Sequence, residues 1–153
     1  MLRTLKNLLQ TVIAAPSEAS PAEQAHFLQL ATAVLLVEVM RAEPELGVAE
    51  RLAVVDALRR NFAMSEDEGA QLVALAEETA RSANDFHQFT SAINNGFDQE
   101  RKIRIVEYMW QVAYADGRLD AHENHLISRI AGLLHVTHGE YIAAKLHAKE
   151  SLR

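Results

Sequence analysis

Apolar residues recur at intervals of three and four positions along nearly the whole chain, which is the spacing of amphipathic and buried helices. No run of alternating apolar and polar residues is long enough to form a strand. The pattern therefore predicts an all-α protein, a compact bundle of about eight helices that forms one domain over residues 1–153. The expected helices cover residues 2–13, 21–42, 48–62, 66–82, 85–95, 99–115, 121–134 and 138–151.

Short polar motifs mark the expected helix starts. Ser20 is followed by Pro21, and Glu23 comes three residues after the serine, which is the pattern of a capping box with proline at the first helical position. The same pairing of a hydroxyl residue with a glutamate three positions later begins at Ser65 and at Thr137. Three aspartates are the expected caps of further helices: Asp85, Asp98 and Asp120.

The expected helix over residues 2–13 is amphipathic. Its apolar positions are Leu2, Leu5, Leu8, Leu9, Val12 and Ile13, with Arg3 and Lys6 between them. Gln10 and Thr11 interrupt the apolar centre that an export signal needs, so we expect this helix to dock on the bundle. The longest apolar stretch, residues 27–40, is too short and too interrupted to span a membrane, and a cytoplasmic location is expected.

Two halves of the chain resemble one another at an offset of 73 positions, with residues 30–58 aligned on 103–131. Leu46 then falls on Leu119, and Glu50 falls on Glu123. The expected pseudo-repeats cover about residues 27–82 and 99–151. Because two copies are too few for a solenoid, the pattern favours a compact bundle with two similar halves.

The leading helix of each expected repeat, over residues 21–42 and 99–115, is apolar on most of its faces. Helices of this kind belong in a protein core, so we expect the two to pack against each other at the centre. Trp110 lies in the second of them and is expected to be a buried anchor rather than a surface platform.

Charge and composition exclude several classes of function. The chain has no cysteine, which excludes disulfides, thiol catalysis and cysteine-ligated metal sites. The segment 38–78 contains ten acidic and four basic residues, whereas acids and bases balance in the remainder, so the net charge of −6 lies in this segment. A nucleic-acid binder needs a basic face, and only a short basic stretch, Arg101, Lys102 and Arg104, offers one. The acidic segment is either a set of solvated helix faces or a surface for a cation or basic partner.

One motif carries possible chemistry: residues 115–123 read Ala-Asp-Gly-Arg-Leu-Asp-Ala-His-Glu. With the Trp110 region before it and an apolar helix after it, the segment resembles the tellurite-resistance protein B (TerB-like) family over roughly residues 25–150. A related helical domain stands at the front of a membrane-anchored DnaJ-type co-chaperone. The resemblance implies a non-enzymatic all-helical module linked to stress and tellurite resistance. It also implies metal binding at acidic positions, here Asp116, Asp120 and Glu123, and more weakly Glu43 and Glu50.

The residues themselves allow two interpretations of this motif. In the structural one, Gly117 forms a turn, Asp120 caps the next helix, and Glu123 reaches back to the cap amide. In the functional one, Asp116 and Glu123 hold a divalent cation, with Glu43 and Glu50 contributing across a pseudo-two-fold axis. An EF-hand site is disfavoured because its first ligand positions are taken by apolar and aromatic residues. The first copy also departs from the motif, with Pro44 and Gly47 in place of glycine and aspartate.

No catalytic set is visible in the sequence: it lacks a P-loop, a nucleophile elbow and a His-Glu-x-x-His motif. We therefore expect no enzyme activity and no cofactor beyond a weakly held divalent cation. The leading hypothesis is a module that binds a protein partner through the acidic segment 38–78. The alternative is a cation- or oxyanion-handling domain that uses the acidic turns. The sequence does not identify the partner or the oligomeric state.

Overall fold

The computed structural model describes residues 20–42, 48–82, 86–115 and 121–151. These residues contain seven helices and no strand, which confirms the all-α fold class. The expected helix over residues 2–13 lies outside the described residues. The helices are α2 (Pro21–Arg41), α3 (Val48–Phe62), α4 (Glu66–Ser82), α5 (His87–Gly96), α6 (Gln99–Tyr114), α7 (Ala121–Leu133) and α8 (His138–Ser151).

Helix α2 starts with the capping box that the sequence predicts. The backbone N–H of Glu23 donates to Ser20 Oγ at 3.1 Å, and the N–H of Ser20 donates to Glu23 Oε1 at 3.1 Å. These bonds satisfy amide groups that have no partner within a helix. The same reciprocal bonds are present at the starts of α4 and α8, in the pairs Ser65/Glu68 and Thr137/Glu140.

The remaining predicted caps have different outcomes. Asp98 caps α6, because its Oδ1 accepts from the N–H of Arg101 at 2.9 Å. Asp85 and Asp120 lie outside the described residues. The predicted start of α5 at residue 85 is wrong, since the helix begins at His87, preceded by Phe86, whose side chain makes no capping bond.

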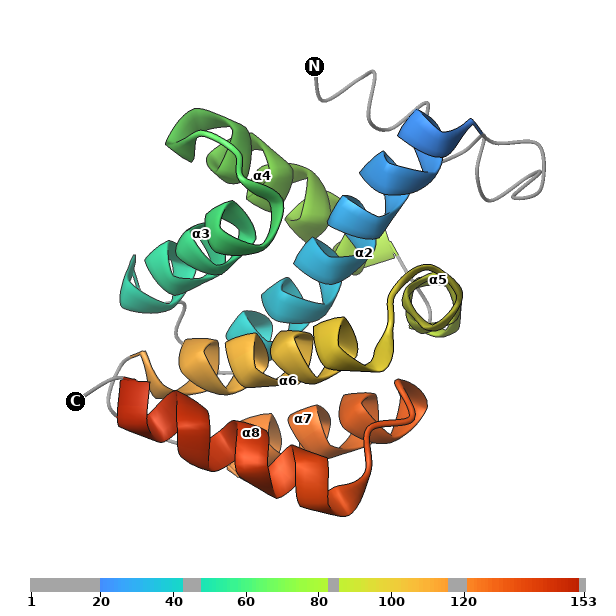
Figure 1. Ribbon diagram of the computed structural model, residues 1–153. Helices are drawn as coiled ribbons and strands as arrows, with labels where there is room; N and C mark the ends of the chain where they lie inside the picture. The colour runs from blue at the N-terminus through green and yellow to red at the C-terminus, as the bar shows by residue number, and fades with distance from the viewer. Residues whose placement is uncertain (1–19, 43–47, 83–85, 116–120, 152–153) are drawn as a thin grey trace.

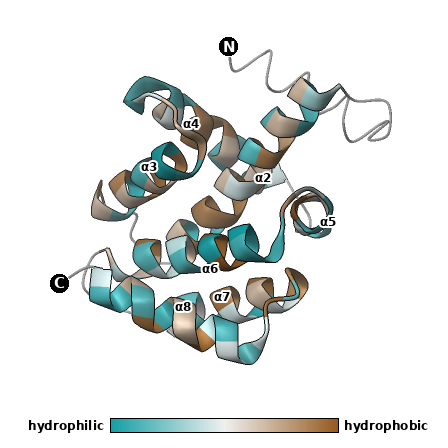
Figure 2. Ribbon diagram, viewed as in Figure 1, coloured by the Kyte–Doolittle hydropathy of each residue, from teal (hydrophilic) through white to brown (hydrophobic). Residues whose placement is uncertain are grey.

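Helices α2 and α6 form the centre of the bundle, as their apolar sequences predict. Helix α2 packs against α3, α4 and α5 as well as α6, and α6 packs in turn against α3, α7 and α8. Figure 1 shows α6 crossing the molecule between α2 and α3 on one side and α7 and α8 on the other. Figure 2 shows hydrophobic residues along the middle of α2. Every residue from Leu30 to Val37 is buried.

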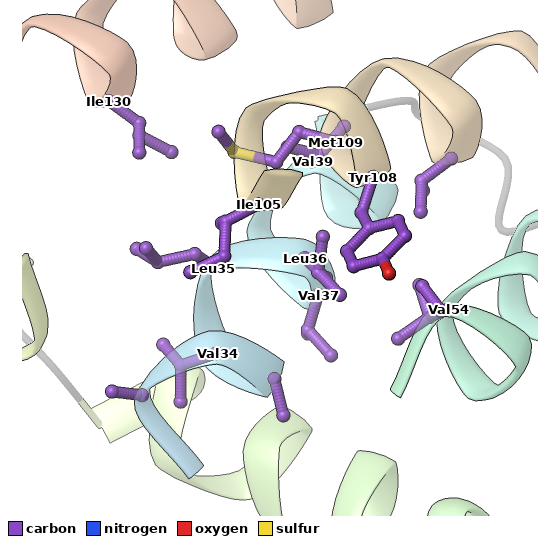
Figure 3. Close-up of a cluster of buried hydrophobic side chains, with 14 of the residues drawn as sticks. Val34, Leu35, Leu36, Val37, Val39, Val54, Ile105, Tyr108, Met109 and Ile130 are labelled. Atoms are coloured by element: carbon purple, nitrogen blue, oxygen red, sulfur yellow. The ribbon is translucent and has the colours of Figure 1, made fainter. Parts of the chain in front are cut away.

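The core between these helices is continuous. Figure 3 shows side chains of α2, α6, α3 and α7 meeting in one cluster, with Leu36 and Val37 of α2 next to Tyr108 of α6 and Val54 of α3. Trp110 is also fully buried, in contact with Tyr141 of α8, with ring centroids 5.4 Å apart. This confirms Trp110 as a core anchor.

Two helices are followed, within two residues, by a non-glycine residue with a positive φ. Ala63 (φ 50°) follows α3 and His135 (φ 59°) follows α7. Each stands two residues before the hydroxyl cap of the next helix, Ser65 or Thr137. The left-handed conformation turns the chain sharply from one helix into the next, a role that glycine usually fills.

The short basic stretch at the start of α6 does not form a basic face. Lys102 is buried, and its Nζ lies 3.4 Å from Asn94 Oδ1 of α5. The Asn94 amide in turn donates to the carbonyl of Leu133 at 2.9 Å. Lys102 therefore takes part in a polar link between α5, α6 and the end of α7. No helix among the described residues is long and apolar enough to cross a bilayer.

Candidate functional site

The structure describes two of the five acidic residues that the sequence singles out. Glu50 is the third residue of α3, and Glu123 is the third residue of α7. Both stand in the first turn, where the helix dipole and the exposed amide groups favour a carboxylate. The other three residues, Glu43, Asp116 and Asp120, lie outside the described residues.

Both glutamates are buried: the exposed fraction is 1% for Glu50 and 0% for Glu123. In each of them the carboxylate oxygen Oε2 is enclosed by the protein. This differs from Glu23 and Glu68, which make their capping bonds at exposed sites. The sequence predicts capping roles for Glu23, Glu68 and Glu123 and aligns Glu50 on Glu123, but of these four only Glu50 and Glu123 belong to the core.

The described residues do not assemble a metal centre by themselves. Within the ranges that the structure covers, no three His, Asp or Glu side chains are grouped closely enough to hold an ion. Glu50 and Glu123 also come from helices that lie on opposite sides of α6 in Figure 1. Because Mg²⁺ and Ca²⁺ require about six or more oxygen ligands, any site at either glutamate needs further ligands from its acidic turn.

A different feature stands out on the surface of α3. Val48 is 76% exposed and Leu52 is 58% exposed, more than any other large apolar side chain in the described part of the chain. They are four residues apart on one helix, so their side chains lie next to each other. We call this pair the α3 face. Apolar side chains that are exposed next to each other make this part of α3 a candidate contact surface.

The α3 face lies in the part of the chain that is richest in acidic residues. Arg51 pairs with Glu77 of α4, which holds the edge of α4 against this part of α3. Glu38 stands in the last turns of α2, and its Oε1 lies 3.0 Å from Arg41 Nη1. Burial raises the pKa of the Glu38 carboxyl, and the positive charge of Arg41 opposes that rise. Further acids are adjacent in sequence, namely Glu78 of α4 and the residues Glu43 and Glu45 before α3. In sequence, the α3 face thus belongs to the segment 38–78, which contains ten acids and four bases.

A second exposed apolar pair lies on α8, a helix that contains two glutamates and two lysines. Ile142 is 38% exposed and Leu146 is 56% exposed. The same helix has Lys145 and Lys149 next to Leu146 in sequence, and Lys145 Nζ lies 4.9 Å from the centre of the Trp110 ring. We call this pair the α8 face. The two faces match in the spacing of their apolar residues, but only the α3 face lies in the acidic segment 38–78.

The α3 face is a feature that the sequence analysis missed. The helix 48–62 has a buried stripe that includes Val54, Ala57 and Leu58, which faces α2 and α6. Val48 and Leu52 stand outside that stripe and have no position in the core. Apolar residues four apart on the polar side of an amphipathic helix are the signal that could have identified them.

One protein-family model, described as tellurite resistance protein TerB, matches residues 29–146 of the chain. The match covers all seven helices in whole or in part, including both glutamates and both exposed faces. Neither a curated protein nor a solved structure matches the chain.

Proposed function

Because the chain belongs to the TerB family of tellurite resistance proteins, we propose that it is a non-enzymatic helical module that binds a protein partner in stress or tellurite-resistance-type responses. The observation that supports partner binding is the α3 face, an exposed apolar pair in acidic surroundings. The sequence adds support, because it contains no recognisable nucleophile, phosphate-binding loop or metalloprotease motif.

The surroundings of the α3 face define the chemistry of the partner. Apolar side chains on the partner would remove Val48 and Leu52 from water. Lysine or arginine residues beside them would meet the acids of the segment 38–78, which increases the association rate and excludes acidic competitors. We therefore infer that the partner presents a basic amphipathic segment.

Calorimetric titration with a defined probe tests this proposal. The probe is a synthetic amphipathic helix of leucine and lysine, and the control probe has glutamate in place of lysine. We expect binding of the lysine probe only, and we expect Leu52→Arg to weaken it by at least about tenfold, or 1.4 kcal/mol. The matched variant Leu146→Arg changes the α8 face and should leave the affinity unchanged. Equal affinity for both probes, or equal loss in both variants, contradicts the proposal.

We also propose that the two halves of the bundle arose by duplication. The packing of α2 against α4 resembles that of α6 against α8, and α3 follows α2 as α7 follows α6. Glu50 and Glu123 occupy the same third position of their helices. Ala63 and His135, which both have a positive φ, stand 72 positions apart, as do the caps Ser65 and Thr137, so the alignment shifts by one residue after α3 and α7.

A second candidate function is divalent-cation binding by the acidic turns. The observation that favours it is the burial of Glu50 and Glu123, which follow the acidic residues Glu43 and Asp116 by seven positions each in the sequence. Titration with Ca²⁺, Mg²⁺, Mn²⁺ and Zn²⁺ distinguishes the two functions. A cation site predicts heat of binding and a higher melting temperature at millimolar ion, both lost in Glu123→Gln. The partner-binding module predicts neither effect.

A further inference from the structure

Two asparagines stand side by side near the end of α5 and have opposite surroundings. The amide of Asn94 is held at both of its atoms: Nδ2 donates to the carbonyl of Leu133 at 2.9 Å, and Oδ1 accepts from Lys102 Nζ at 3.4 Å. Asn95 is exposed, and no residue in the described part of the chain forms a hydrogen bond with its side chain. The described residues therefore fix the amide of Asn94 and leave that of Asn95 in contact with water.

The residue after Asn95 is Gly96, which is the last residue of α5. A Cβ atom at this position would lie 2.7 Å from Leu28 Cδ1 and 2.9 Å from Leu28 Cδ2, both on α2. Non-bonded carbon atoms do not approach so closely, so a larger residue would displace Leu28 from its place against the core. No other asparagine of the sequence is followed by glycine. The packing of α5 on α2 thus favours an Asn-Gly pair at this exposed position.

An Asn-Gly pair reacts within itself when its backbone is free to bend. The backbone nitrogen of the glycine loses its proton to hydroxide and attacks Cγ of the asparagine. A bond forms between these two atoms, the bond from Cγ to Nδ2 breaks, and ammonia leaves. Water then opens the resulting cyclic imide at either of its carbonyl groups, which gives aspartate or isoaspartate. Glycine favours the attack because it has no Cβ atom and its backbone adopts most conformations.

The last turn of α5 must open for this attack, and little in the helix itself opposes the opening. The preceding residue, Phe86, makes no side-chain capping bond, and α5 has neither an acidic residue in its first turn nor a basic residue in its last. Its final residues, Asn94, Asn95 and Gly96, have low helix propensity. Because helix ends open at a small cost in free energy, Asn95 and Gly96 can leave the helix without unfolding of the bundle.

We propose that Asn95 is a modification site of the folded protein, at which deamidation converts the Asn-Gly pair to aspartate and isoaspartate. Either product places a negative charge at the carboxyl end of α5, where the helix dipole disfavours it. Isoaspartate also adds a methylene group to the backbone directly before Gly96, where α5 fits closely against Leu28. Deamidation therefore loosens α5 from α2. This modification goes beyond the proposed function, because it requires only water and no partner.

Mass spectrometry of the full chain after storage at mildly alkaline pH tests the proposal. Digestion locates the mass increase of amide-to-acid conversion, and enzymatic methylation of isoaspartate identifies the product. We expect Asn95 to convert at least about tenfold faster than Asn94 in the folded protein, a difference of about 1.4 kcal/mol in activation free energy. Asn95→Gln keeps an amide at this position, but its longer side chain must close a larger ring, so this variant should abolish the reaction there.

Hydrogen exchange of the stored protein tests the structural consequence. The deamidated fraction should exchange its α5 amides faster than the intact fraction, with unchanged exchange in α6 as the control for a folded bundle. Unchanged exchange in α5 would contradict the loosening from α2.

Storage in urea supplies a matched comparison for the chemistry, because unfolding releases Asn94 from Leu133 and Lys102. We expect the rate at Asn94 to rise more on unfolding than the rate at Asn95. Conversion of Asn95 in urea but not in the folded protein would show that α5 protects the pair and would overturn the proposal. Equal rates at Asn94 and Asn95 in the folded chain, or aspartate without isoaspartate, would also contradict it. None of these results depends on whether a basic probe binds, so this proposal and the proposed function can fail separately.

Discussion

Glu50 and Glu123 stand 73 positions apart, and each is the buried third residue of its helix. A carboxylate is expensive to bury unless hydrogen bonds and positive potential stabilise it. The first turn of a helix supplies both, through its amide groups and its dipole. Two buried carboxylates in equivalent first turns indicate that they stabilise the starts of α3 and α7.

Replacement of Glu123 tests this structural role. We expect Glu123→Ala to lower the free energy of unfolding by about 1–3 kcal/mol, because the buried polar groups around Glu123 lose its carboxylate as a partner. Glu68→Ala removes an exposed capping glutamate and should cost about 0.5–1 kcal/mol. Urea unfolding with and without EDTA provides the measurement. The cost should be the same in both conditions, and a cost that disappears in EDTA indicates a metal ligand instead.

Trp110 is expected to contribute more to stability than any exposed aromatic residue could. Its ring is fully buried against Tyr114 and Tyr141, so Trp110→Ala should cost about 3–5 kcal/mol. Among the residues described, no atom accepts a hydrogen bond from the buried Nε1–H of Trp110. A phenylalanine at this position therefore breaks no hydrogen bond. We expect Trp110→Phe to cost less than half as much as Trp110→Ala. Denaturant unfolding followed by circular dichroism measures both, and equal costs contradict this packing.

Gly69 and Gly132 should respond in opposite directions to the same substitution. A Cβ atom at Gly69 would lie 3.1 Å from Val55 Cγ1, because α3 and α4 approach closely there. A Cβ atom at Gly132 would meet nothing within 4 Å. We expect Gly132→Ala to stabilise α7 by about 0.5–1 kcal/mol through helix propensity, and Gly69→Ala to destabilise the protein or leave it unchanged. Thermal melting of the two variants makes the comparison, and a clear rise for Gly69→Ala contradicts the close approach.

The contact between α6 and α8 includes a pH-sensitive pair. His147 Nδ1 donates to Glu107 Oε1 at 2.8 Å, and this hydrogen bond, with the Glu107 charge, raises the pKa of His147 above its usual 6.5. The pair therefore stabilises the fold fully below pH 6.5, and its contribution disappears as the pH rises through the raised pKa.

We expect His147→Gln to lower stability at about pH 5.5 and to have little effect at about pH 8.5. Glu107→Gln should reduce the same pH dependence, since it removes the partner. Urea midpoints at the two pH values measure the effect. A His147→Gln effect that is larger at the higher pH contradicts the pairing.

Local sequence patterns were sufficient to predict most of the helices. The apolar spacing gave the ends of α3, α4 and α8 as the structure has them, and the capping motif at Ser20 marked the start of α2. These features depend on residues within a few positions of each other. The start of α5 was predicted less well, because Phe86 offers no side-chain cap and therefore no sequence signal.

Burial of polar groups could not be predicted from the sequence, because it depends on which helices pack together. Glu23 and Glu123 both suit a capping box, but only Glu123 is enclosed by the bundle. Lys102 was grouped with two exposed arginines, although α5 covers it in the fold. The α3 face differs from these cases, because Val48 and Leu52 stand outside the apolar stripe of their helix and the sequence itself contains that signal.

The proposed function, partner binding through the α3 face in tellurite resistance, is tested most directly by survival at graded tellurite concentrations of cells that lack this protein and of the same cells after it is returned to them. Cells that produce Leu52→Arg should become as sensitive as cells without the protein, whereas cells with equal amounts of Leu146→Arg should survive like the wild type. Wild-type survival with Leu52→Arg, or equal sensitivity in both variants, would contradict the claim.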